Sequence, residues 1–510
     1  MLLVKLICFK IIFLVKLPLL EIIMNYKKDL LEAYLLRQIG DNHLVNEINQ
    51  SQYVSRNMEI RLDKYVKDFI ADNRKPRWIV VPGLRGVGKT TLIGQIYTKL
   101  YSQFVQHKKD SEQFNIIYIS LDIINNFKAN LSDVIEVYEQ ILGCELYKAK
   151  QPIFMFIDEV QTDRNWSQFL KTVYDRTPQL FMICTGSSAT YLQMDANTAG
   201  RRACIERLYP LSFTEYQTIA HKLYPVKDLK NQIIQSLYYC QSAREVYQAL
   251  QKLEPQIARS WSQYDENNIE PYILSDIMPF ALKYDNKFEF QKELLNTLEK
   301  IIVNDLMTDT RFNFRYESII NIKRLLLIIA DNTETPSLAT LSDALGVSRP
   351  LIASMLDALV KAELLIKIPA YGSSLYNIKA PARYQFMSSS SRSVLRSPVG
   401  KSATLASKQG DLLEDVATLH YYKEFVITSK GFLTYPYIKK RQPNCDFILQ
   451  VNNHHQVALE FGWGVKNIDQ VKQTMQNIRC DYGLVFSKTP LRLHEADNIV
   501  SIPLKYFFLI

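Results

Sequence analysis

One short segment of the chain has the residue types and the spacing that hold a phosphate chain. Residues 83–91 read GLRGVGKTT and match the pattern G-x-x-x-x-G-K-[ST] at every fixed position. The glycines of this pattern allow a tight turn whose backbone N–H groups point at a phosphate. Lys89 supplies a mobile cation for the β- and γ-phosphates, and the Thr90 hydroxyl is a ligand for Mg²⁺. The segment therefore predicts a site for a nucleoside triphosphate.

The elements on either side of this segment fit the same interpretation. Residues 78–81 form a short apolar strand that ends at Pro82, and apolar spacing over residues 91–97 predicts a helix. A strand, a loop and a helix in this order present the helix N-terminus to an anion. The alternative is a glycine-rich turn that binds nothing, and the order of the elements disfavours it.

Two carboxylates follow an uninterrupted apolar run farther along the chain. Residues 153–157 read IFMFI, and Asp158 and Glu159 come next. Such a run is typical of a parallel strand covered on both faces, whose carboxyl end opens into the crevice where α/β sheets bind ligands. Asp158 is the expected partner of Mg²⁺, and Glu159 is the expected general base for the attacking water. The pair predicts an enzyme that hydrolyses the nucleotide.

Two further sites rest on shorter patterns. Residues 180–188 form another apolar strand that ends near Thr185 and Ser187, whose hydroxyls suit the γ-phosphate or the attacking water. A plain turn is the alternative there. Arg201 precedes the strand-like residues 205–211 and suits the charge of phosphoryl transfer, in cis or from a neighbouring subunit. A surface arginine is the other interpretation.

The order of these motifs resembles that of a family of prokaryotic AAA-like ATPases related to the STAND signalling NTPases. The motifs are GLRGVGKTTL, FIDEVQ with Trp166 shortly after, TGSSA, AGRR and LYPLSFTEY, all between about residues 50 and 220. The resemblance implies ATP with Mg²⁺, and it marks Arg85, Gln161, Trp166 and Arg201 as family positions. No Asn-Lys-x-Asp motif for guanine is present. The residues expected to bind ATP and Mg²⁺ are Gly83, Arg85, Gly86, Val87, Gly88, Lys89, Thr90, Thr91 and Asp158, and those expected in catalysis are Glu159, Lys89 and Arg201.

Length and composition set the frame for these motifs. A chain of 510 residues should hold about three or four domains. Its 47% hydrophobic and 22% charged residues are ordinary for a soluble globular protein, and its net charge of +9 permits nucleic-acid contact without requiring it. Seven scattered cysteines with no C-x-x-C pair disfavour a zinc site and favour a reduced, cytoplasmic environment.

The first 23 residues are very apolar but carry Lys5, Lys10, Lys16 and Glu21 at intervals. Charges inside the run disfavour a spanning helix, and a signal peptide keeps its charges before its apolar core. We therefore expect no integral membrane association. Our interpretation is an over-extended start with Met24 as the true first residue, and a peripheral membrane helix is the alternative.

The segments after the first domain predict two helical modules. Residues 226–325 have helical apolar spacing, and residues 338–368 predict a helix, a turn at Gly346, a second helix and a strand, as in a winged helix. The second helix offers only Arg349 and Lys361 as cations, so packing against the ATPase domain or a protein partner is favoured over contact with DNA. Residues 388–393, SSSSRS, suit a linker, whereas the resemblance favours a packed turn and helix start.

The last part of the chain contains a second set of carboxylates. Glu414 lies on a predicted helix, Asp446 begins an apolar strand, and Glu460 ends the next one, an order that resembles the PD-(D/E)-x-K nuclease superfamily. The resemblance implies a divalent metal at these three residues. The family's lysine position is Gly462 here, and Lys466 could replace it if the loop folds back. The resemblance also marks Gln473. A nuclease-like fold kept as an interaction module is the alternative.

The sequence thus predicts an α/β fold, in which a parallel P-loop NTPase sheet of AAA/STAND type precedes helical, winged-helix and α/β nuclease-like domains. We expect an ATP-hydrolysing switch whose C-terminal domains engage a partner, with an ATP-controlled nuclease acting on DNA or RNA as the alternative. A binding scaffold without turnover is disfavoured. A protein partner and a homo-oligomer are both compatible with the sequence. The expected domains are residues 24–54, 55–225, 226–325, 326–395 and 396–510.

Overall fold

The structure is a computed structural model that divides into two compact units. The first holds the residues up to Gly83 and Gly88–Leu208, and the second holds Leu84–Val87 and Tyr209–Ile510. Residues 1–23, for which we expected an over-extended start, lie outside the described residues. The described residues are 25–39, 43–51, 53–106, 115–187, 201–306, 314, 316–332, 334, 336–372, 381–396, 409–437, 444–452 and 455–510.

A five-stranded parallel sheet forms the centre of the first unit, in the order β2-β3-β4-β1-β5. Its strands β1, β3 and β4 are the apolar runs that the sequence predicts. Strand β2 was not predicted, and β5 ends at Ile205, where we expected a strand from residue 205 to residue 211 to begin. Beyond that point Glu206 and Leu208 still donate backbone hydrogen bonds to β1. The strands are β1 (Trp78–Pro82), β2 (Asn115–Ser120), β3 (Ile153–Asp158), β4 (Leu180–Gly186) and β5 (Ala203–Ile205).

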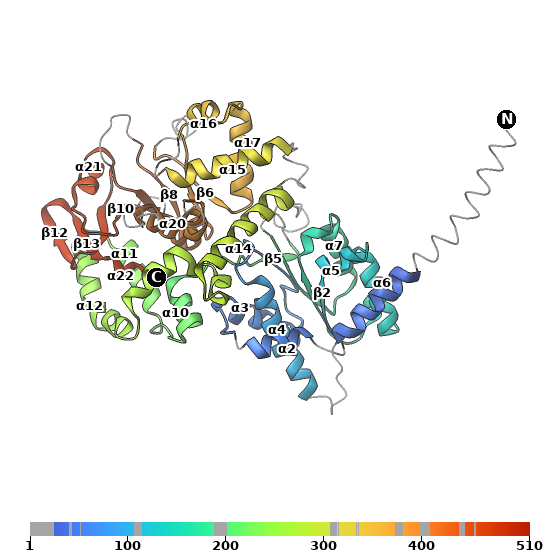
Figure 1. Cartoon of the computed structure of the whole chain (residues 1–510). Coiled ribbons are helices and arrows are strands. Elements are labelled where there is room, and N and C mark those ends of the chain that lie inside the picture. The colour runs from blue at the N-terminus through green and yellow to red at the C-terminus, as the bar shows by residue number, and fades with distance from the viewer. Residues whose placement is uncertain are drawn as a thin grey trace, which may run out of the picture. The chain divides into compact units, whose positions relative to one another are not determined.

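Helices cover both faces of this sheet (Figure 1). On one face, Phe69 of α3 packs against Phe154 and Phe181, with ring centroids 5.5 and 5.3 Å away. On the other, Trp166 of α7 meets Trp78 edge to face at 6.3 Å. Successive side chains of the apolar strands thus point to opposite faces of the sheet and contribute to a hydrophobic core on each face. The helices are residues 25–39, α2 (His43–Ser51), α3 (Asn57–Asp72), α4 (Lys89–Gln106), α5 (Leu121–Asn126), α6 (Leu131–Leu142) and α7 (Trp166–Arg176).

The second unit begins with helices and a two-stranded hairpin. Two of its helices and the antiparallel strands β6 and β7 fall where the sequence predicts a helix–turn–helix and a following strand. The elements are α10 (Phe213–His221), α11 (Leu229–Tyr238), α12 (Ala243–Trp261), α13 (Ile269–Pro271), the π-helix η4 (Tyr272–Asp276), α14 (Lys287–Lys300), α15 (Tyr316–Asp331), α16 (Leu338–Leu345), α17 (Arg349–Lys361), β6 (Leu365–Ile368) and β7 (Arg383–Phe386).

A mixed six-stranded sheet, ordered β12-β13-β11-β10-β9-β8, ends the second unit. Strands β10, β11 and β13 run parallel, and β8, β9 and β12 pair antiparallel to their neighbours. In the chain, the helix α20 precedes the two strands next to the acidic residues, and the helix α21 follows them. The elements are α19 (Ser389–Arg396), α20 (Gln409–Tyr421), β8 (Gly431–Thr434), β9 (Phe447–Val451), β10 (His455–Phe461), α21 (Asp469–Asn477), β11 (Tyr482–Ser487), β12 (Arg492–His494), β13 (Ile499–Pro503) and α22 (Leu504–Phe507).

The serine-rich residues 388–393 are part of the core and not a linker. They begin α19 and are buried, and Ser389 donates to the carbonyl of Ile273 at 2.6 Å. Arg392 of this helix is 1% exposed and forms an ion pair with Asp415 of α20 at 2.7 Å. The short hydroxyl side chains can be buried because neighbouring oxygens satisfy their donors.

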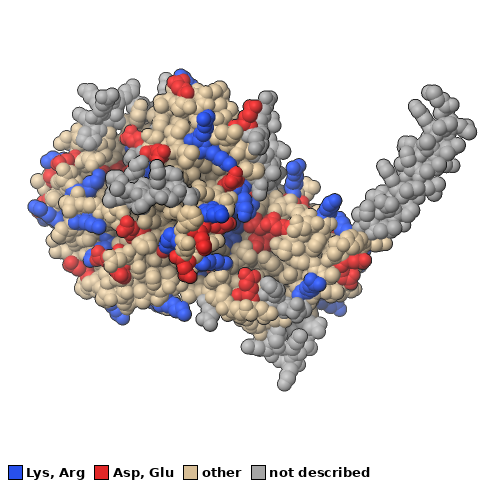
Figure 2. Space-filling model, viewed as in Figure 1, with Lys and Arg blue, Asp and Glu red and all other residues tan. Residues whose placement is uncertain are grey.

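The molecular surface mixes both signs of charge. On the face shown in Figure 2, Lys and Arg side chains are interspersed with Asp and Glu over the second unit. Within the described residues, no helix has both the length and the apolar character that a membrane crossing requires.

Candidate functional site

The glycine-rich loop has the backbone shape of an anion cradle. Gly86 and Gly88 adopt φ angles of 86° and 90°, which side chains disfavour. The helix α4 starts directly after the loop, at Lys89, so its first N–H groups face outward from the helix end. Lys89 is buried, and its Nζ donates to the carbonyl of Gly83 at 3.0 Å. The lysine therefore folds back over the loop, in the place where a phosphate chain would meet its charge.

Asp158 lies beside this loop. The Thr90 hydroxyl donates to Asp158 Oδ2 at 2.6 Å, although 68 residues separate the two in the sequence. Thr185 of β4 donates to the other carboxylate oxygen, Oδ1. Because β3 and β4 are parallel neighbours, their carboxyl ends place these side chains at one edge of the sheet. The structure thus brings together the two residues that the sequence assigns to Mg²⁺.

Tyr118 is a further neighbour of Asp158 that the sequence reasoning missed. Its hydroxyl donates to Asp158 Oδ2 at 3.2 Å from the adjacent strand β2. Burial, and then the Asp158 charge, raise the pKa of Tyr118, so the phenol stays protonated as a donor. The short apolar run around this tyrosine was the available signal, but no strand was predicted there, and only the strand order places the side chain here.

Glu159 has an unusual backbone conformation. Its φ of 55° lies in the left-handed region, which residues other than glycine seldom adopt outside functional sites or turns. Gln161 donates from Nε2 to Glu159 Oε2, and its Oε1 accepts from the backbone N–H of Ser187 at 3.3 Å. Gln161 thus links the candidate base to the end of β4.

Other expected residues occupy different surroundings. Trp166 is fully buried against Trp78 and is a core residue. Arg201 is exposed, while its neighbour Arg202 pairs with Asp175. Arg85 forms an ion pair with Asp305 at 3.0 Å within the second unit.

Ser187, the other expected hydroxyl, is 3% exposed at the end of β4. Its Oγ has no hydrogen-bond partner among the described residues. A buried hydroxyl without a partner is uncommon and is satisfied readily by a ligand or water oxygen.

This donor set fits a magnesium nucleotide. A hydroxyl and a carboxylate oxygen are the hard ligands that Mg²⁺ takes from proteins, with the remaining positions left to water and phosphate. The positive-φ glycines, the helix N-terminus and Lys89 all favour a polyphosphate anion. The Glu159 carboxylate is suited to accept a proton from water.

The carboxylates of the second unit have separate hydrogen-bond partners. Gln385 donates to Glu414 at 3.0 Å, the amide of Phe461 donates to Asp446 at 2.7 Å, and Lys466 binds Glu460 at 2.5 Å. Within the described residues, no group of three or more Asp, Glu, His or Cys side chains is arranged to hold a metal ion. The candidate metal ligands are therefore engaged by other donors in this structure.

These three carboxyls nevertheless lie within each other's electrostatic field. Burial, and then the Asp446 charge, raise the pKa of Glu460 to about 8 and the pKa of Glu414 well above its usual range. Burial also raises the pKa of Asp446, against the lowering effects of the Phe461 amide and Lys466. Glu460 Oε2 is buried and has no described partner. Burial of these carboxylates thus costs free energy, and a bound cation would reduce that cost.

Lys466 reaches Glu460 by lying across Gly462. A Cβ at position 462 would collide with the Cγ of Lys466, so the glycine makes room for the lysine stem. Gln470, which the sequence reasoning missed, accepts from Lys466 Nζ at 3.4 Å and donates to the carbonyl of Asn444. Gln473, which we expected, is half-buried on the same helix, α21.

One known protein family covers the segment that holds the first site. The family model described as "AAA domain" matches residues 75–217. Among solved structures, the chain is similar to the ORC2 protein of Aeropyrum pernix in its ADPNP–ADP complexes, with 13% identity, a TM-score of 0.35, and coverage of 72% of this chain and 94% of that one. The chain is also similar to ORC1 of the same organism in complex with DNA, with 10% identity, a TM-score of 0.30, and coverage of 67% of this chain and 92% of that one.

A relative in sequence covers nearly the whole chain. The uncharacterized protein MJ1637 of Methanocaldococcus jannaschii is 30% identical over 487 residues, which are 94% of this chain and 94% of that protein. Residues 75–217, which include the parallel sheet and the phosphate loop, form an AAA-type P-loop ATPase domain. The chain therefore belongs to the family of MJ1637, as a member built on an AAA-type ATPase domain.

Proposed function

We propose that the protein binds ATP with Mg²⁺ at the loop of residues 83–91, hydrolyses it, and uses the cycle as a molecular switch. The observation that carries the proposal is the 2.6 Å hydrogen bond between Thr90 and Asp158. It joins the helix that follows the phosphate loop to the acidic end of β3, as a shared ion would require. Bound Mg²⁺ supplies charge neutralisation at the β- and γ-phosphates.

The residues around the loop have different roles in hydrolysis. The glycine-shaped loop and Lys89 bind and orient the phosphates, and Asp158 is held in place by Tyr118 and Thr185. Glu159 accepts the proton of the attacking water, with its carboxylate oriented by Gln161. Arg201 is exposed and suited to act on a neighbouring subunit, which supports the assembly of several copies.

Phosphate release from ATP tests this proposal when wild type is compared with Glu159→Gln. The variant keeps the shape of the side chain but loses the base, so we expect unchanged ATP affinity and a turnover lower by about 10²–10⁴-fold. The exposed Lys64→Ala on α3 is the matched control and should leave both quantities unchanged. Wild-type turnover in Glu159→Gln would contradict the assignment of the base.

The modules after the ATPase domain engage a partner in this proposal. The order α16, α17, β6 and β7 supports a winged helix. On α17 the cation Lys361 pairs with Asp357 at 2.7 Å, which leaves Arg349 as the exposed cation of that helix. This neutralised surface supports a protein partner over a DNA duplex, because DNA binding depends on several phosphate contacts.

A metal-dependent nuclease acting on DNA or RNA is the second candidate function. It is supported by the buried carboxyls of Glu414 and Glu460, whose pKa values burial and the Asp446 charge raise, and by the position of Lys466 across Gly462. The separate donors on each carboxylate count against it. Incubation of DNA and RNA with Mg²⁺ or Mn²⁺ should show cleavage by wild type and none by Asp446→Ala, with Asp469→Ala as the exposed control on α21. Equal or absent cleavage in all three would exclude the nuclease.

A further inference from the structure

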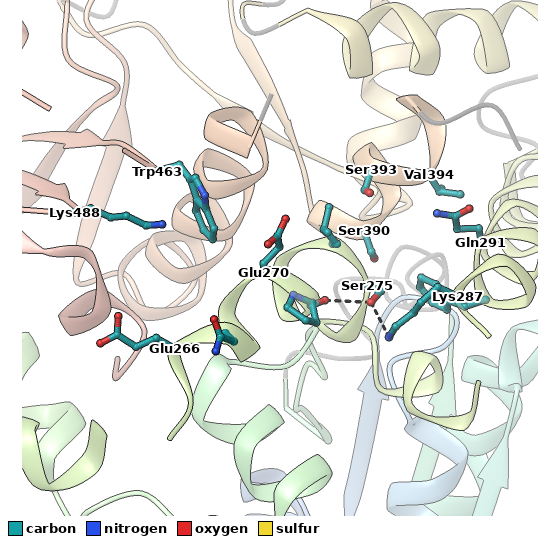
Figure 3. Close-up of a pocket in the computed structure, with 14 residues that line it drawn as sticks. Glu266, Glu270, Ser275, Lys287, Gln291, Ser390, Ser393, Val394, Trp463 and Lys488 are labelled. Atoms are coloured by element: carbon teal, nitrogen blue, oxygen red, sulfur yellow. Dashed lines mark hydrogen bonds between the residues drawn. The ribbon is translucent and has the colours of Figure 1, made fainter. Parts of the chain in front are cut away.

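A cavity of about 480 Å³ lies within the second unit, away from the phosphate loop in the sequence. Its walls come from the α13–η4 segment, from α14 and α19, and from the loops that follow β10 and β11 (Figure 3). The volume falls in the range of small-molecule sites, which are concave and combine an apolar lining with a few polar groups. Buried Phe290 and Val394 supply part of the apolar lining.

Trp463 is fixed at one side of this cavity. The residues on both sides of it are tied to the end of β11, since Gly462 N–H donates to the carbonyl of Phe486 at 2.8 Å and Lys488 N–H donates to the carbonyl of Gly464 at 3.0 Å. Lys488 Nζ lies 5.1 Å from the centre of the indole ring. The backbone that carries the ring is therefore held in place on both sides, which preorganises the ring as a flat platform.

The other face of the platform looks toward a carboxylate. In Figure 3 the Trp463 ring lies between Lys488 and Glu270. Gln409 donates to Glu270 Oε1 at 2.7 Å, and no described group binds Oε2, so this exposed carboxylate retains an acceptor for a ligand. Its geometry suits the edge of a planar ring that carries N–H donors, because a carboxylate accepts two parallel hydrogen bonds.

The remaining charges of the cavity are mostly engaged with the protein itself. Lys287 binds Asp276 at 2.5 Å and Ser275 at 3.1 Å, and Glu266 binds Lys505 at 2.9 Å. Lys488 has no carboxylate partner among the described residues. It is exposed, and its flexible stem leaves the ammonium group able to meet an anion beside the ring.

We propose that this cavity binds a nucleotide, with its base stacked on Trp463, the N–H edge of the base on Glu270, and its phosphate at Lys488. Stacking on a tryptophan is available to every base, whereas two N–H donors on one edge select guanine. The same chemistry comes from a free nucleotide or from an unpaired base of a single strand. The site is independent of the phosphate loop and goes beyond the ATPase function proposed above.

Equilibrium dialysis with GMP tests the site, in the full chain carrying Lys89→Ala so that the phosphate loop does not contribute. IMP lacks the exocyclic amino group of guanine and serves as the comparison ligand. A labelled six-nucleotide RNA strand with one guanosine, followed by fluorescence anisotropy, is the second arm. Each ligand is measured with Trp463→Ala, Trp463→Phe, Glu270→Gln and, as a control in the same loop, the exposed Val465→Ala.

We expect saturable binding that Trp463→Ala weakens by about tenfold or more, and that Trp463→Phe and Val465→Ala preserve. GMP should bind about fivefold or more tightly than IMP, and Glu270→Gln should remove that preference. Stronger binding of GMP identifies a free nucleotide, and stronger binding of the strand identifies a single-stranded nucleic acid. No saturable binding of either ligand, or equal binding by the Trp463→Ala protein, would overturn the proposal. Turnover of ATP by Trp463→Ala in the otherwise wild-type chain should be unchanged, so the two proposals fail separately.

Discussion

At the scale of single residues, the backbone of Glu159 is the most informative feature of the ATPase site. A non-glycine residue with φ of 55° costs free energy, on the order of 1 kcal/mol or more, and persists where its surroundings impose the conformation. The side chain is held by Gln161, which also accepts from the Ser187 amide at 3.3 Å. Strain that is kept at the candidate base is consistent with a carboxylate aimed at one position.

The role of Gln161 can be separated from that of Glu159. We predict that Gln161→Ala lowers ATP turnover by about tenfold and leaves ATP affinity unchanged, because it frees the base to rotate. Gln161→Glu should lower turnover further, since a second carboxylate would face Glu159. Steady-state phosphate release and equilibrium ATP binding measure the two quantities. A loss of affinity equal to the loss of turnover would show that Gln161 acts on nucleotide binding instead.

The residues of this site differ in how far the sequence reveals them. Lys89, Thr90 and Asp158 were foreseeable because the loop has fixed spacing and an acidic pair follows a fully apolar strand. Tyr118 was not, because its contact with Asp158 depends on β2 lying next to β3 in the sheet. The resemblance marks Trp166 as a family position, but in the structure its side chain is packed in the core.

At the scale of elements, Arg392 holds several segments of the second unit together. Its guanidinium binds Asp415 of α20, the carbonyl of Ile329 in α15 at 3.0 Å, and Gln385 of β7. Gln385 in turn donates to Glu414 at 3.0 Å. The sequence SSSSRS resembles a linker in composition, and composition alone does not reveal that the arginine within it has a buried partner 23 residues away.

Removal of one partner of this buried pair should be strongly destabilising. We predict that Asp415→Ala costs about 3–5 kcal/mol, because Arg392 would remain buried without its counter-charge. Replacement of both residues, as Arg392→Met with Asp415→Leu, should recover part of that loss.

Thermal unfolding of the full chain, followed by circular dichroism, measures this loss of stability. The exposed pair of Lys323 and Glu299 provides the control, and Glu299→Ala should cost less than about 1 kcal/mol. Equal melting temperatures for Asp415→Ala and wild type would mean that the pair does not stabilise this unit.

At the scale of the whole molecule, the sequence predicts β1, β3 and β4 of the parallel sheet in the first unit, because these strands are continuous apolar runs. The second unit is harder to foresee, because its mixed sheet joins strands whose neighbours are set by crossovers such as the one between β10 and β11. The winged-helix and nuclease-like assignments therefore remain proposals about segments whose elements fall in the expected order.

Assembly of several copies is the prediction that belongs to this scale. Arg201 is exposed, and an arginine that acts on a neighbouring subunit contributes only where copies meet. We predict that the specific ATPase activity of wild type rises with protein concentration and that Arg201→Ala removes this rise. Arg202→Ala is the matched control, because Arg202 already pairs with Asp175. A specific activity that is independent of concentration would contradict a role in trans.

The central claim is that Thr90 and Asp158 hold Mg²⁺ on an ATP molecule bound by the loop around Lys89. Equilibrium dialysis of labelled ATP, with Mg²⁺ and with EDTA, tests it most directly. The account predicts saturable uptake by wild type that weakens about tenfold or more in EDTA, no uptake by Lys89→Ala, and a Mg²⁺ effect that is lost in Thr90→Ala and kept in Thr90→Ser. Absence of saturable uptake by wild type, or uptake that EDTA leaves unchanged, would contradict it.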